Sequence, residues 1–359
     1  MFTYWLVFLF FAIFAMIGKA RIPIIANYPH KLNIDFMWLF IIIFLTVFIG
    51  FRFEVGGDWG AYLMYYDSFS GIYLRDAFNI TSDPGYILIN WASSELGWGI
   101  YGVNTICGFI FALGLAIFCR NLPRPLLALL AAIPYLLIVV GMGYSRQGVA
   151  LGFAMMGFVA LGREKKLLFI FLSFLATAFH KTAIVMLPIA ALAATKNRFW
   201  LIIWTGALGV LSYVTVFSDS FDRLYLYYVE HSYQSEGALI RLLMLLLPSI
   251  LILLWPHRFT FTVPELSLWR VCAFISIGLF ALLFISNAST AVDRIALYML
   301  PIQLVIFSYL PEIFGQKGEA RQWIVISIII YFGLVLLVWS MFSDYSVFWK
   351  PYQNILLKF

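Results

Sequence analysis

The chain has 359 residues, of which 64% are hydrophobic and 11% are charged, and its mean hydropathy is +0.96. Apolar runs of about 20 residues match the hydrocarbon thickness of a bilayer, so this composition excludes a soluble globular protein. The net charge is +6, but no basic run is suited to a nucleic-acid backbone, and nucleic acid is not an expected partner. The runs are continuous and do not alternate in polarity, which favours membrane-spanning helices over a β-barrel.

The apolar segments predict an all-α polytopic membrane protein with about twelve transmembrane helices in a single integral membrane domain, residues 1–359. The first segment lacks a basic start and a cleavage site, so we expect it to be retained. The predicted spans cover residues 2–18, 36–51, 100–118, 125–142, 146–162, 166–179, 182–195, 199–217, 240–255, 268–286, 294–310 and 322–342. The sixth and seventh spans are short, so one long tilted helix over 166–195 is a competing interpretation.

Charge indicates how the chain is oriented in the membrane. When alternate loops are assigned to opposite sides, most Lys and Arg residues fall on one side, which should be cytoplasmic. Both termini then face outward, together with a large loop at 51–99, between the second and third helices, and a second loop at 218–240. A short apolar stretch after Pro84 predicts an interfacial helix within the first loop. We therefore expect function on the outer face.

Neither metal nor disulfide chemistry is indicated. Cys107, Cys119 and Cys272 lie in or beside apolar segments without a CxxC pair, as small core residues do. No HExxH motif or acidic cluster predicts a metal site, and no glycine-rich nucleotide loop or serine-hydrolase spacing is present. The predicted cytoplasmic loops are too short for a sugar-nucleotide domain. If the protein uses a glycosyl donor, that donor should therefore arrive on a lipid, and no cofactor is expected.

The 51–99 loop concentrates charge in a chain that has little of it. Arg52 and Asp58 follow a span directly, and Gly56, Gly57 and Gly60 would let backbone approach a ligand closely. An interfacial belt of snorkelling and aromatic side chains accounts for the same pattern equally well. Asp83 precedes Pro-Gly, which is also an ordinary turn sequence.

Two arginines lie at predicted outward ends of spans. Arg146 is at the mouth of a helical hairpin, where Gly148 and Gly152 are spaced for close helix contact. Arg294 is four residues before Tyr298, so the two share a helix face. A guanidinium at such a position suits a phosphate, although a lone arginine is more often a helix end in the headgroup layer.

Three further polar residues are candidates for the functional site. Asp293 precedes Arg294 and can pair with another cation. His180 and Lys181 lie at the junction of the two short spans, where a helix pair would present both at the outer surface or in a cavity. A lone histidine is more often structural than catalytic.

Short motifs in a fixed order resemble the EpsG-like family, which overlaps the Wzy-type O-antigen and exopolysaccharide polymerases. They are Arg52…Gly57-Asp58-Trp59…Tyr62, Asp83-Pro84-Gly85-Tyr86, Ser145-Arg146-Gln147, His180-Lys181-Thr182-Ala183, Asp293-Arg294…Tyr298…Pro301 and Pro351-Tyr352-Gln353-Asn354. In this family the Pro-Gly-Tyr motif often follows Glu, whereas this chain has Asp83, which is one methylene shorter.

The resemblance implies a multi-span, polyprenyl-dependent glycosyltransferase of the GT-C-like class in the bacterial inner membrane, with its active site facing the periplasm. It would join undecaprenyl-pyrophosphate-linked oligosaccharide repeat units by metal-independent inverting displacement. Donor and acceptor glycans on undecaprenyl pyrophosphate and membrane lipids are the expected partners, and a chain-length regulator is a further candidate. The implied roles are pyrophosphate binding by Arg52, Arg146 and Arg294, general base catalysis by Asp58, Asp83 or His180, and substrate contact by Tyr62, Tyr86, Tyr298 and Lys181.

Two alternatives remain open at this point. An O-antigen ligase would use the same donor chemistry and a large outer loop. A transporter or flippase of lipid-linked glycans belongs to another class and should show internal repeats or charges near the middle of the membrane. Here the charges cluster at the outer mouth and no clear repeat is visible, which favours an enzyme.

Overall fold

The computed structural model describes residues 1–18, 20, 35–80, 83–193, 203, 235, 237–286, 289–315 and 318–357. In this part of the chain the secondary structure is helical, apart from one isolated antiparallel β-bridge between Arg52 and Asn354. The predicted all-helical fold is confirmed. The predicted span at 199–217 and most of the predicted loop at 218–240 lie outside the described residues.

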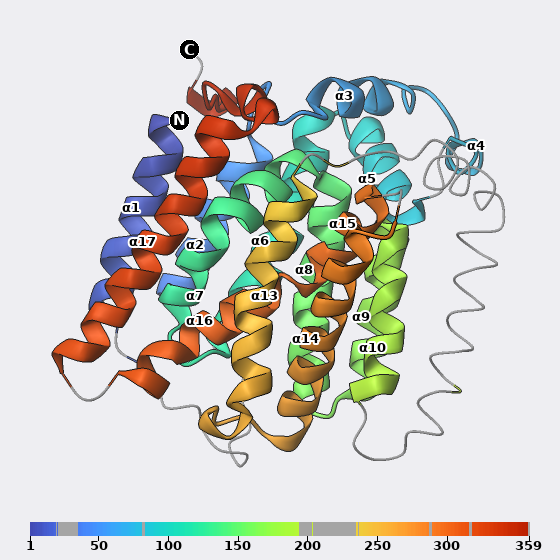
Figure 1. Ribbon diagram of the computed structural model, residues 1–359. Coiled ribbons are helices and arrows are strands. Elements are labelled where there is room, and N and C mark those ends of the chain that lie inside the picture. Colours follow the sequence, from blue (N-terminus) through green and yellow to red (C-terminus); the bar gives the residue numbers. More distant parts are fainter. Residues whose placement is uncertain are drawn as a thin grey trace.

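The helices follow the predicted spans closely (Figure 1). Those that coincide with predicted spans are α1 (Phe2–Ile17), α2 (Phe36–Gly50), α6 (Gly99–Arg120), α7 (Pro125–Ala132) with the π-helix η1 (Ile133–Gly141), α8 (Ser145–Gly162), α9 (Lys166–Phe179), η2 (Lys181–Val185) with α10 (Met186–Ala193), α13 (Ala238–Leu254), α14 (Val263–Leu283), α15 (Ser289–Ala296) with η6 (Leu297–Met299) and α16 (Pro301–Phe314), and α17 (Glu319–Phe342). The remaining helices are α3 (Trp59–Asp67), α4 (Leu74–Ala77), α5 (Pro84–Glu95), η5 (Pro256–Arg258), η7 (Asp344–Trp349) and η8 (Ile355–Leu357).

Length and hydropathy identify the strongest membrane spans among the described residues. Three helices, α6, α14 and α17, are long and apolar enough to cross a bilayer. The segment made by α15, η6 and α16 is a fourth if its 43° bend before Pro301 is counted as part of one span. Shorter apolar helices surround them, so the chain is a helical multi-pass membrane protein. The total of about twelve spans and the side that each loop faces stay predictions.

The segment 166–195 breaks at His180. Helix α9 ends at Phe179, His180 has extended backbone (φ −155°, ψ 119°), and η2 begins at Lys181. Helix α9 contacts both η2 and α10. The competing interpretation of one continuous helix is therefore wrong, because two elements meet at His180.

Helix α6 is central because it packs against both α2 and α8. A Cβ added to Gly114 of α6 would lie 2.2 Å from the carbonyl oxygen of Gly152, so the two backbones are in direct contact. The predicted close contact at Gly152 is confirmed, whereas a Cβ at Gly148 would make only an ordinary contact, 3.5 Å from the oxygen of Val140 on η1. The contact between Gly114 and Gly152 holds the middle of α8 close to α6.

One end of the bundle, the upper end in Figure 1, carries α3, α5, η7 and both chain termini. The C-terminal tail pairs with the segment after α2, where the Phe53 N–H donates to the Gln353 carbonyl at 3.0 Å. The Trp349 Nε1–H of η7 donates to the Ile138 carbonyl in η1 at 2.8 Å. Its ring lies on Gly143, where a Cβ would be 2.6 Å away. The segment after α2, the C-terminal tail and the connection between η1 and α8 therefore contact one another at this end of the bundle.

Candidate active site

The residues predicted from separate motifs gather at the upper end. Their elements are the N-cap of α3 (Asp58), the N-cap of α5 (Asp83), the first turn of α8 (Arg146), the α9–η2 junction (His180 and Lys181) and α15 (Arg294). Asp83 interacts electrostatically with Arg146, Lys181 and Arg294, and His180 is near the same three cations. The tertiary fold thus unites motifs that lie far apart in sequence.

Asp83 and Arg146 form the tightest contact of this group. The Arg146 Nη1 donates to Asp83 Oδ2 at 2.6 Å. The Asp83 side chain is 6% exposed, whereas that of Arg146 is 39% exposed. Burial raises the pKa of the Asp83 carboxyl, and the nearby Arg146 guanidinium opposes that rise. Asp83 therefore anchors a cation whose outer part remains accessible.

The Asp-Pro-Gly sequence holds this carboxylate in place. Pro84 occupies the first position of α5, where its missing N–H costs nothing, and the Asp83 carbonyl accepts from the Tyr86 N–H at 3.0 Å. Gly85 allows α5 to approach α9, because a Cβ there would be 2.7 Å from the Phe179 ring. The predicted turn is thus the start of α5, and it places the Asp83 carboxylate beside Arg146 of α8.

Tyr62 and Tyr86 form a buried wall behind Arg146. The Arg146 guanidinium lies 5.8 Å from the Tyr86 ring centroid. The Tyr86 ring contacts Tyr62 edge-on at 5.8 Å and stacks on Tyr65 at 5.5 Å. Tyr86 is 1% exposed and Tyr62 is also buried, and burial raises the pKa of both hydroxyls. This geometry fits support of Arg146 better than the predicted contact with substrate.

His180 is hydrogen-bonded within the protein. Its Nδ1 lies 2.7 Å from Thr182 Oγ1, and that hydroxyl is 3.5 Å from the hydroxyl of the buried Tyr298. Burial lowers the pKa of His180 well below its usual value, and the cations Arg294, Arg146 and Lys181 lower it further. The imidazole is therefore neutral and weakly basic.

A cavity of about 680 Å³ lies beside this cluster. Its polar end includes Asp58 and Arg294, while residues of α13 and α17 form much of the apolar remainder. Burial raises the pKa of Asp58, and the charges of Arg146 and Arg294 oppose the rise. Unlike Asp83, Asp58 borders open space. A carboxylate and a guanidinium from different elements thus face one cavity.

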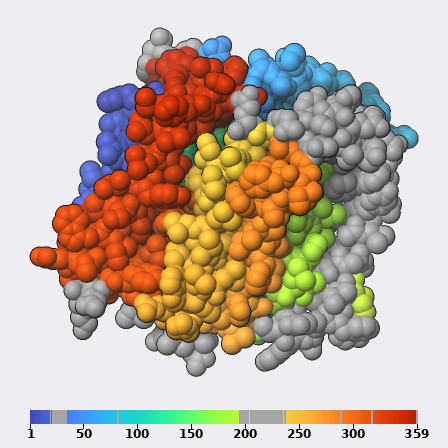
Figure 2. Space-filling view, in the orientation of Figure 1, coloured from blue at the N-terminus to red at the C-terminus, as the bar shows by residue number. Residues whose placement is uncertain are grey.

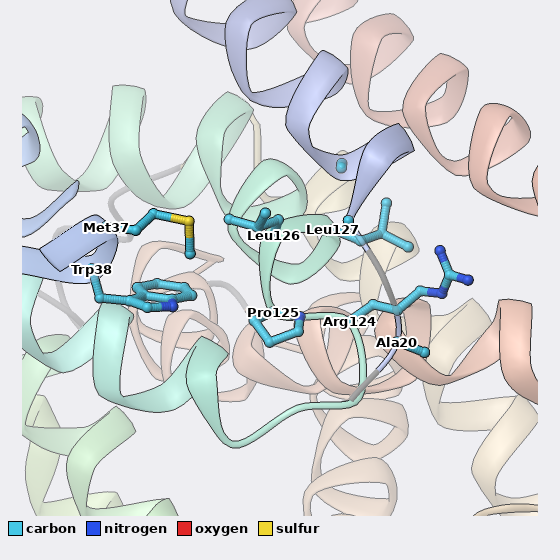
Figure 3. Close-up of a pocket in the computed structure, with 9 residues that line it drawn as sticks. Ala20, Met37, Trp38, Arg124, Pro125, Leu126 and Leu127 are labelled. Carbon is cyan, nitrogen blue, oxygen red and sulfur yellow. The ribbon is translucent and has the colours of Figure 1, made fainter. Parts of the chain in front are cut away.

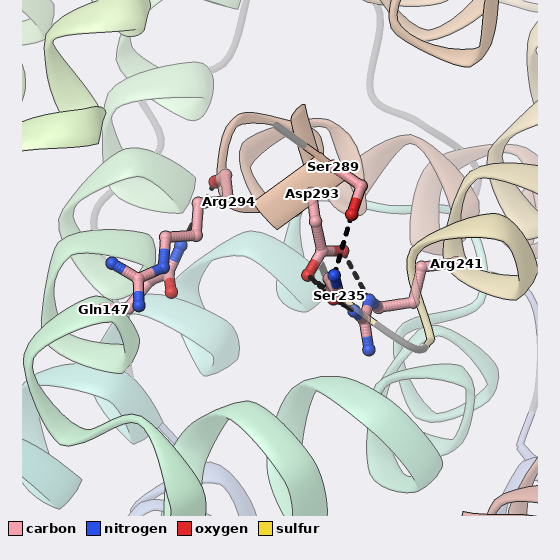
Figure 4. Close-up of polar contacts among 6 residues, drawn as sticks. All are labelled: Gln147, Ser235, Arg241, Ser289, Asp293 and Arg294. Carbon is pink, nitrogen blue, oxygen red and sulfur yellow. Dashed lines mark hydrogen bonds and ion pairs between the residues drawn. The ribbon is translucent and has the colours of Figure 1, made fainter. Parts of the chain in front are cut away.

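Helix α15 sends two charges in different directions (Figure 4). The Arg294 backbone carbonyl accepts from Gln147 Nε2 at 3.1 Å, which ties α15 to α8. Asp293 faces α13, where Nε and Nη2 of Arg241 donate to its two carboxylate oxygens. The Ser235 hydroxyl also donates to Asp293, at 3.0 Å. The predicted pairing of Asp293 with another cation is confirmed.

Arg241 is the site residue that sequence reasoning missed. It lies in the first turn of α13 and lines the cavity, with its guanidinium 5.7 Å from the Tyr135 ring centroid. Its partner Asp293 is 52 residues away in the sequence. The available signal was a charged residue just inside a predicted apolar span, which is costly unless it is paired or functional.

The EpsG family model matches residues 35–354, which include every residue of this cluster. The chain belongs to the EpsG family. This family is linked to exopolysaccharide synthesis. Neither the curated proteins nor the solved structures gave a match to the chain. The family identified from short motifs is confirmed.

In this EpsG family member, the Arg52 guanidinium forms its hydrogen bonds with other groups of the protein. Its guanidinium donates to the carbonyls of Ile49 (2.7 Å) and Val55 (3.3 Å), to Asn104 Oδ1 (3.2 Å) and to Ser145 Oγ (2.8 Å). Arg52 is 1% exposed. It therefore joins α2, α6 and α8, a geometry that fits support of the site rather than the predicted contact with pyrophosphate.

Of the three glycines after α2, Gly56 has a structural role. Gly56 has φ +106°, and a Cβ there would lie 2.9 Å from the Met142 carbonyl oxygen. Gly56 thus approaches the protein backbone, whereas Gly57 has only ordinary contacts and Gly60 has open space around its Cβ position. The loop is fitted to the mouth of the η1–α8 hairpin.

A second cavity of about 280 Å³ lies at the opposite end of the EpsG family fold (Figure 3). Trp38, Arg124 and Leu127 are among its lining residues. The Arg124 Nε donates to Glu312 Oε1 at 2.8 Å. None of the predicted site residues lines this cavity. Within the described residues, no group of three or more His, Cys, Asp or Glu side chains is arranged to hold a metal ion.

Proposed function

We propose that this protein is a glycosyltransferase that polymerises oligosaccharide repeat units carried on undecaprenyl pyrophosphate, at the periplasmic face of the bacterial inner membrane. The observation that carries the proposal is the cavity that Asp58 and Arg294 both line, while apolar residues of α13 and α17 form much of the remaining wall. Such a site suits a lipid-linked pyrophosphate substrate. EpsG family membership supports the same class of product.

The reaction is a single displacement with inversion. A hydroxyl of the acceptor glycan loses its proton to a carboxylate as its oxygen attacks the anomeric carbon of the donor. The bond from that carbon to the pyrophosphate oxygen breaks, and undecaprenyl pyrophosphate leaves with the bonding electron pair. Guanidinium groups stabilise the leaving charge because they bind phosphate oxygens in bidentate geometry.

The geometry favours different roles for the two carboxylates. Asp58 borders the cavity and is the base in this proposal, whereas Asp83 is already paired with Arg146 and positions it. Arg146 and Arg294 bind the pyrophosphate. Lys181 adds positive charge beside them, since it acts electrostatically on both Asp83 and His180.

Surface glycans of a deletion strain test this function. The strain is complemented with wild type, with Arg294→Gln, or with the control Arg75→Gln, whose side chain is exposed on α4. Loss of the polymer ladder with a retained single-repeat band, in the deletion strain and with Arg294→Gln, supports the polymerase. Loss of every glycan band in the deletion strain overturns it in favour of a ligase or a flippase. A normal ladder with Arg294→Gln removes Arg294 from the mechanism.

A further inference from the structure

Helices α13 and α17 border the main cavity from two sides. Helix α13 packs on α14 and α16, and α17 packs on α1, α7 and α16. In Figure 1 the two helices flank the green segment formed by α7 and η1, whose residues Tyr135 and Val139 line the cavity. The space-filling view shows a recess between the red surface of α17 and the yellow surface of α13 (Figure 2). The cavity therefore reaches the side of the bundle.

The walls of this opening are apolar and partly exposed. From α13 they include Ile240 and Leu243, and from α17 they include Leu334, Val338 and Phe342. All five side chains are also exposed on the surface of the protein. Exposed apolar side chains on helices of a membrane protein suit contact with hydrocarbon, which fits an opening toward the lipid phase.

The same cavity carries charged residues, the acids Asp58, Asp293 and Asp344 and two arginines. Arg241 and Arg294 both line the cavity. Arg241 donates from Nε and Nη2 to Asp293 and from Nη2 to Ser235, and its guanidinium also hydrogen-bonds the Tyr135 side chain. The third guanidinium nitrogen of Arg241, Nη1, lies against Gly237. A Cβ at that position would be only 2.5 Å from Nη1, so glycine is needed to make room for it. Asp293 and Tyr135 thus hold Arg241 in place where it lines the cavity.

We infer that the opening between α13 and α17 is the lateral entrance for a polyprenyl pyrophosphate, with its isoprenoid tail against Leu243 and Val338 and its pyrophosphate between Arg241 and Arg294. This assignment rests on the proposed function and specifies where that substrate enters. A lateral entrance suits such a lipid because much of its tail can stay in the bilayer while the headgroup reaches the site. Arg241 becomes a phosphate-binding residue in addition to Arg146 and Arg294.

Photo-crosslinking of the full-length protein in phosphatidylcholine nanodiscs tests the entrance. Benzoylphenylalanine replaces either Val338, which lines the cavity, or its neighbour Leu337, which is not among the lining residues; both are 38% exposed. The probe is undecaprenyl pyrophosphate without sugar. We expect the adduct to form at least fivefold more from position 338, and Arg241→Gln to weaken labelling about tenfold. Equal labelling from both positions, or phosphatidylcholine adducts alone at position 338, overturns the assignment.

A second pair of variants does not depend on the photoreactive group. Ile240→Trp fills the opening, whereas Leu239→Trp places the same ring beside it on a residue that does not line the cavity. Binding of undecaprenyl pyrophosphate should fall about tenfold with Ile240→Trp and stay unchanged with Leu239→Trp. Equal binding by both variants contradicts the entrance.

The two proposals fail in different ways. Because the probe carries no glycan, its binding does not require polymerase activity. Crosslinking at Val338 in a protein whose deletion leaves the polymer ladder intact supports the entrance and overturns the polymerase. A ladder that depends on the protein, without selective crosslinking at Val338, supports the polymerase and overturns the entrance.

Discussion

Asp83 and Arg146 are 63 residues apart in sequence, yet a 2.6 Å hydrogen bond joins their side chains. The pair links the start of α5 to the start of α8 and sets the direction of the Arg146 guanidinium. Asp83 is largely enclosed by this contact, while Asp58 opens on the cavity. This difference supports the proposal that Asp83 positions Arg146 and that Asp58 is the base.

Replacement of Asp83 tests the positioning role. We expect Asp83→Asn to slow chain growth about 100-fold, the scale of losing one oriented transition-state donor, because Arg146 loses the charge that orients it. Asp83→Glu keeps the charge and should retain more activity. The measurement is the rate of polymer formation from a defined lipid-linked repeat unit in nanodiscs. An unchanged rate for Asp83→Asn would show that Arg146 does not depend on this pair.

The pH profile tests Asp58 as the base. Burial raises the pKa of Asp58 above its usual value of 3.8, so activity should be present above the raised pKa and disappear as pH falls through it. Asp58→Asn should reduce the rate about 10²- to 10⁴-fold. Asp67→Asn, an exposed acid at the other end of α3, is the matched control and should keep wild-type activity.

The variant His180→Gln tests whether the histidine, rather than a carboxylate, is the general base. The pKa of His180 is lowered well below 6.5, so the imidazole is neutral near pH 7, and if Asp58 is the base the acid limb belongs to Asp58 and not to His180. The limb should therefore stay in place in this variant. An acid limb that disappears with His180→Gln would transfer the base role to the histidine.

Sequence patterns located the spans well because apolar length is a local property, and α9 begins and ends at the predicted residues 166 and 179. The functions of individual arginines were less predictable. Arg52, Arg146 and Arg294 all follow or begin apolar segments, but Arg52 is enclosed by Asn104 and Ser145, which only the tertiary fold brings close. The place of Arg241 in the site could not be predicted for the same reason, since its partner Asp293 belongs to another helix.

The enclosure of Arg52 predicts a stability phenotype. Arg52→Gln leaves several buried acceptors without a donor, so we expect the free energy of unfolding to fall by about 3–5 kcal/mol. The protein should accumulate poorly and unfold at lower temperature in detergent. Arg75→Gln, on the exposed surface of α4, is the control and should match wild type. A stable but inactive Arg52→Gln would instead favour direct contact with substrate.

The contact between α6 and α8 gives a prediction that is independent of catalysis. Gly114→Ala must separate the two backbones, because the new Cβ would lie 2.2 Å from the Gly152 carbonyl oxygen. Such overpacking costs about 1–3 kcal/mol. Gly278→Ala on α14 is the matched control, since no atom lies within 4 Å of its Cβ position and alanine has the higher helix propensity. Thermal unfolding of the purified proteins should show a lower midpoint for Gly114→Ala alone. Because Arg146 and Ser145 begin α8, a shift of this helix should also slow polymerisation, and equal midpoints for the two variants would contradict the close contact on which the site depends.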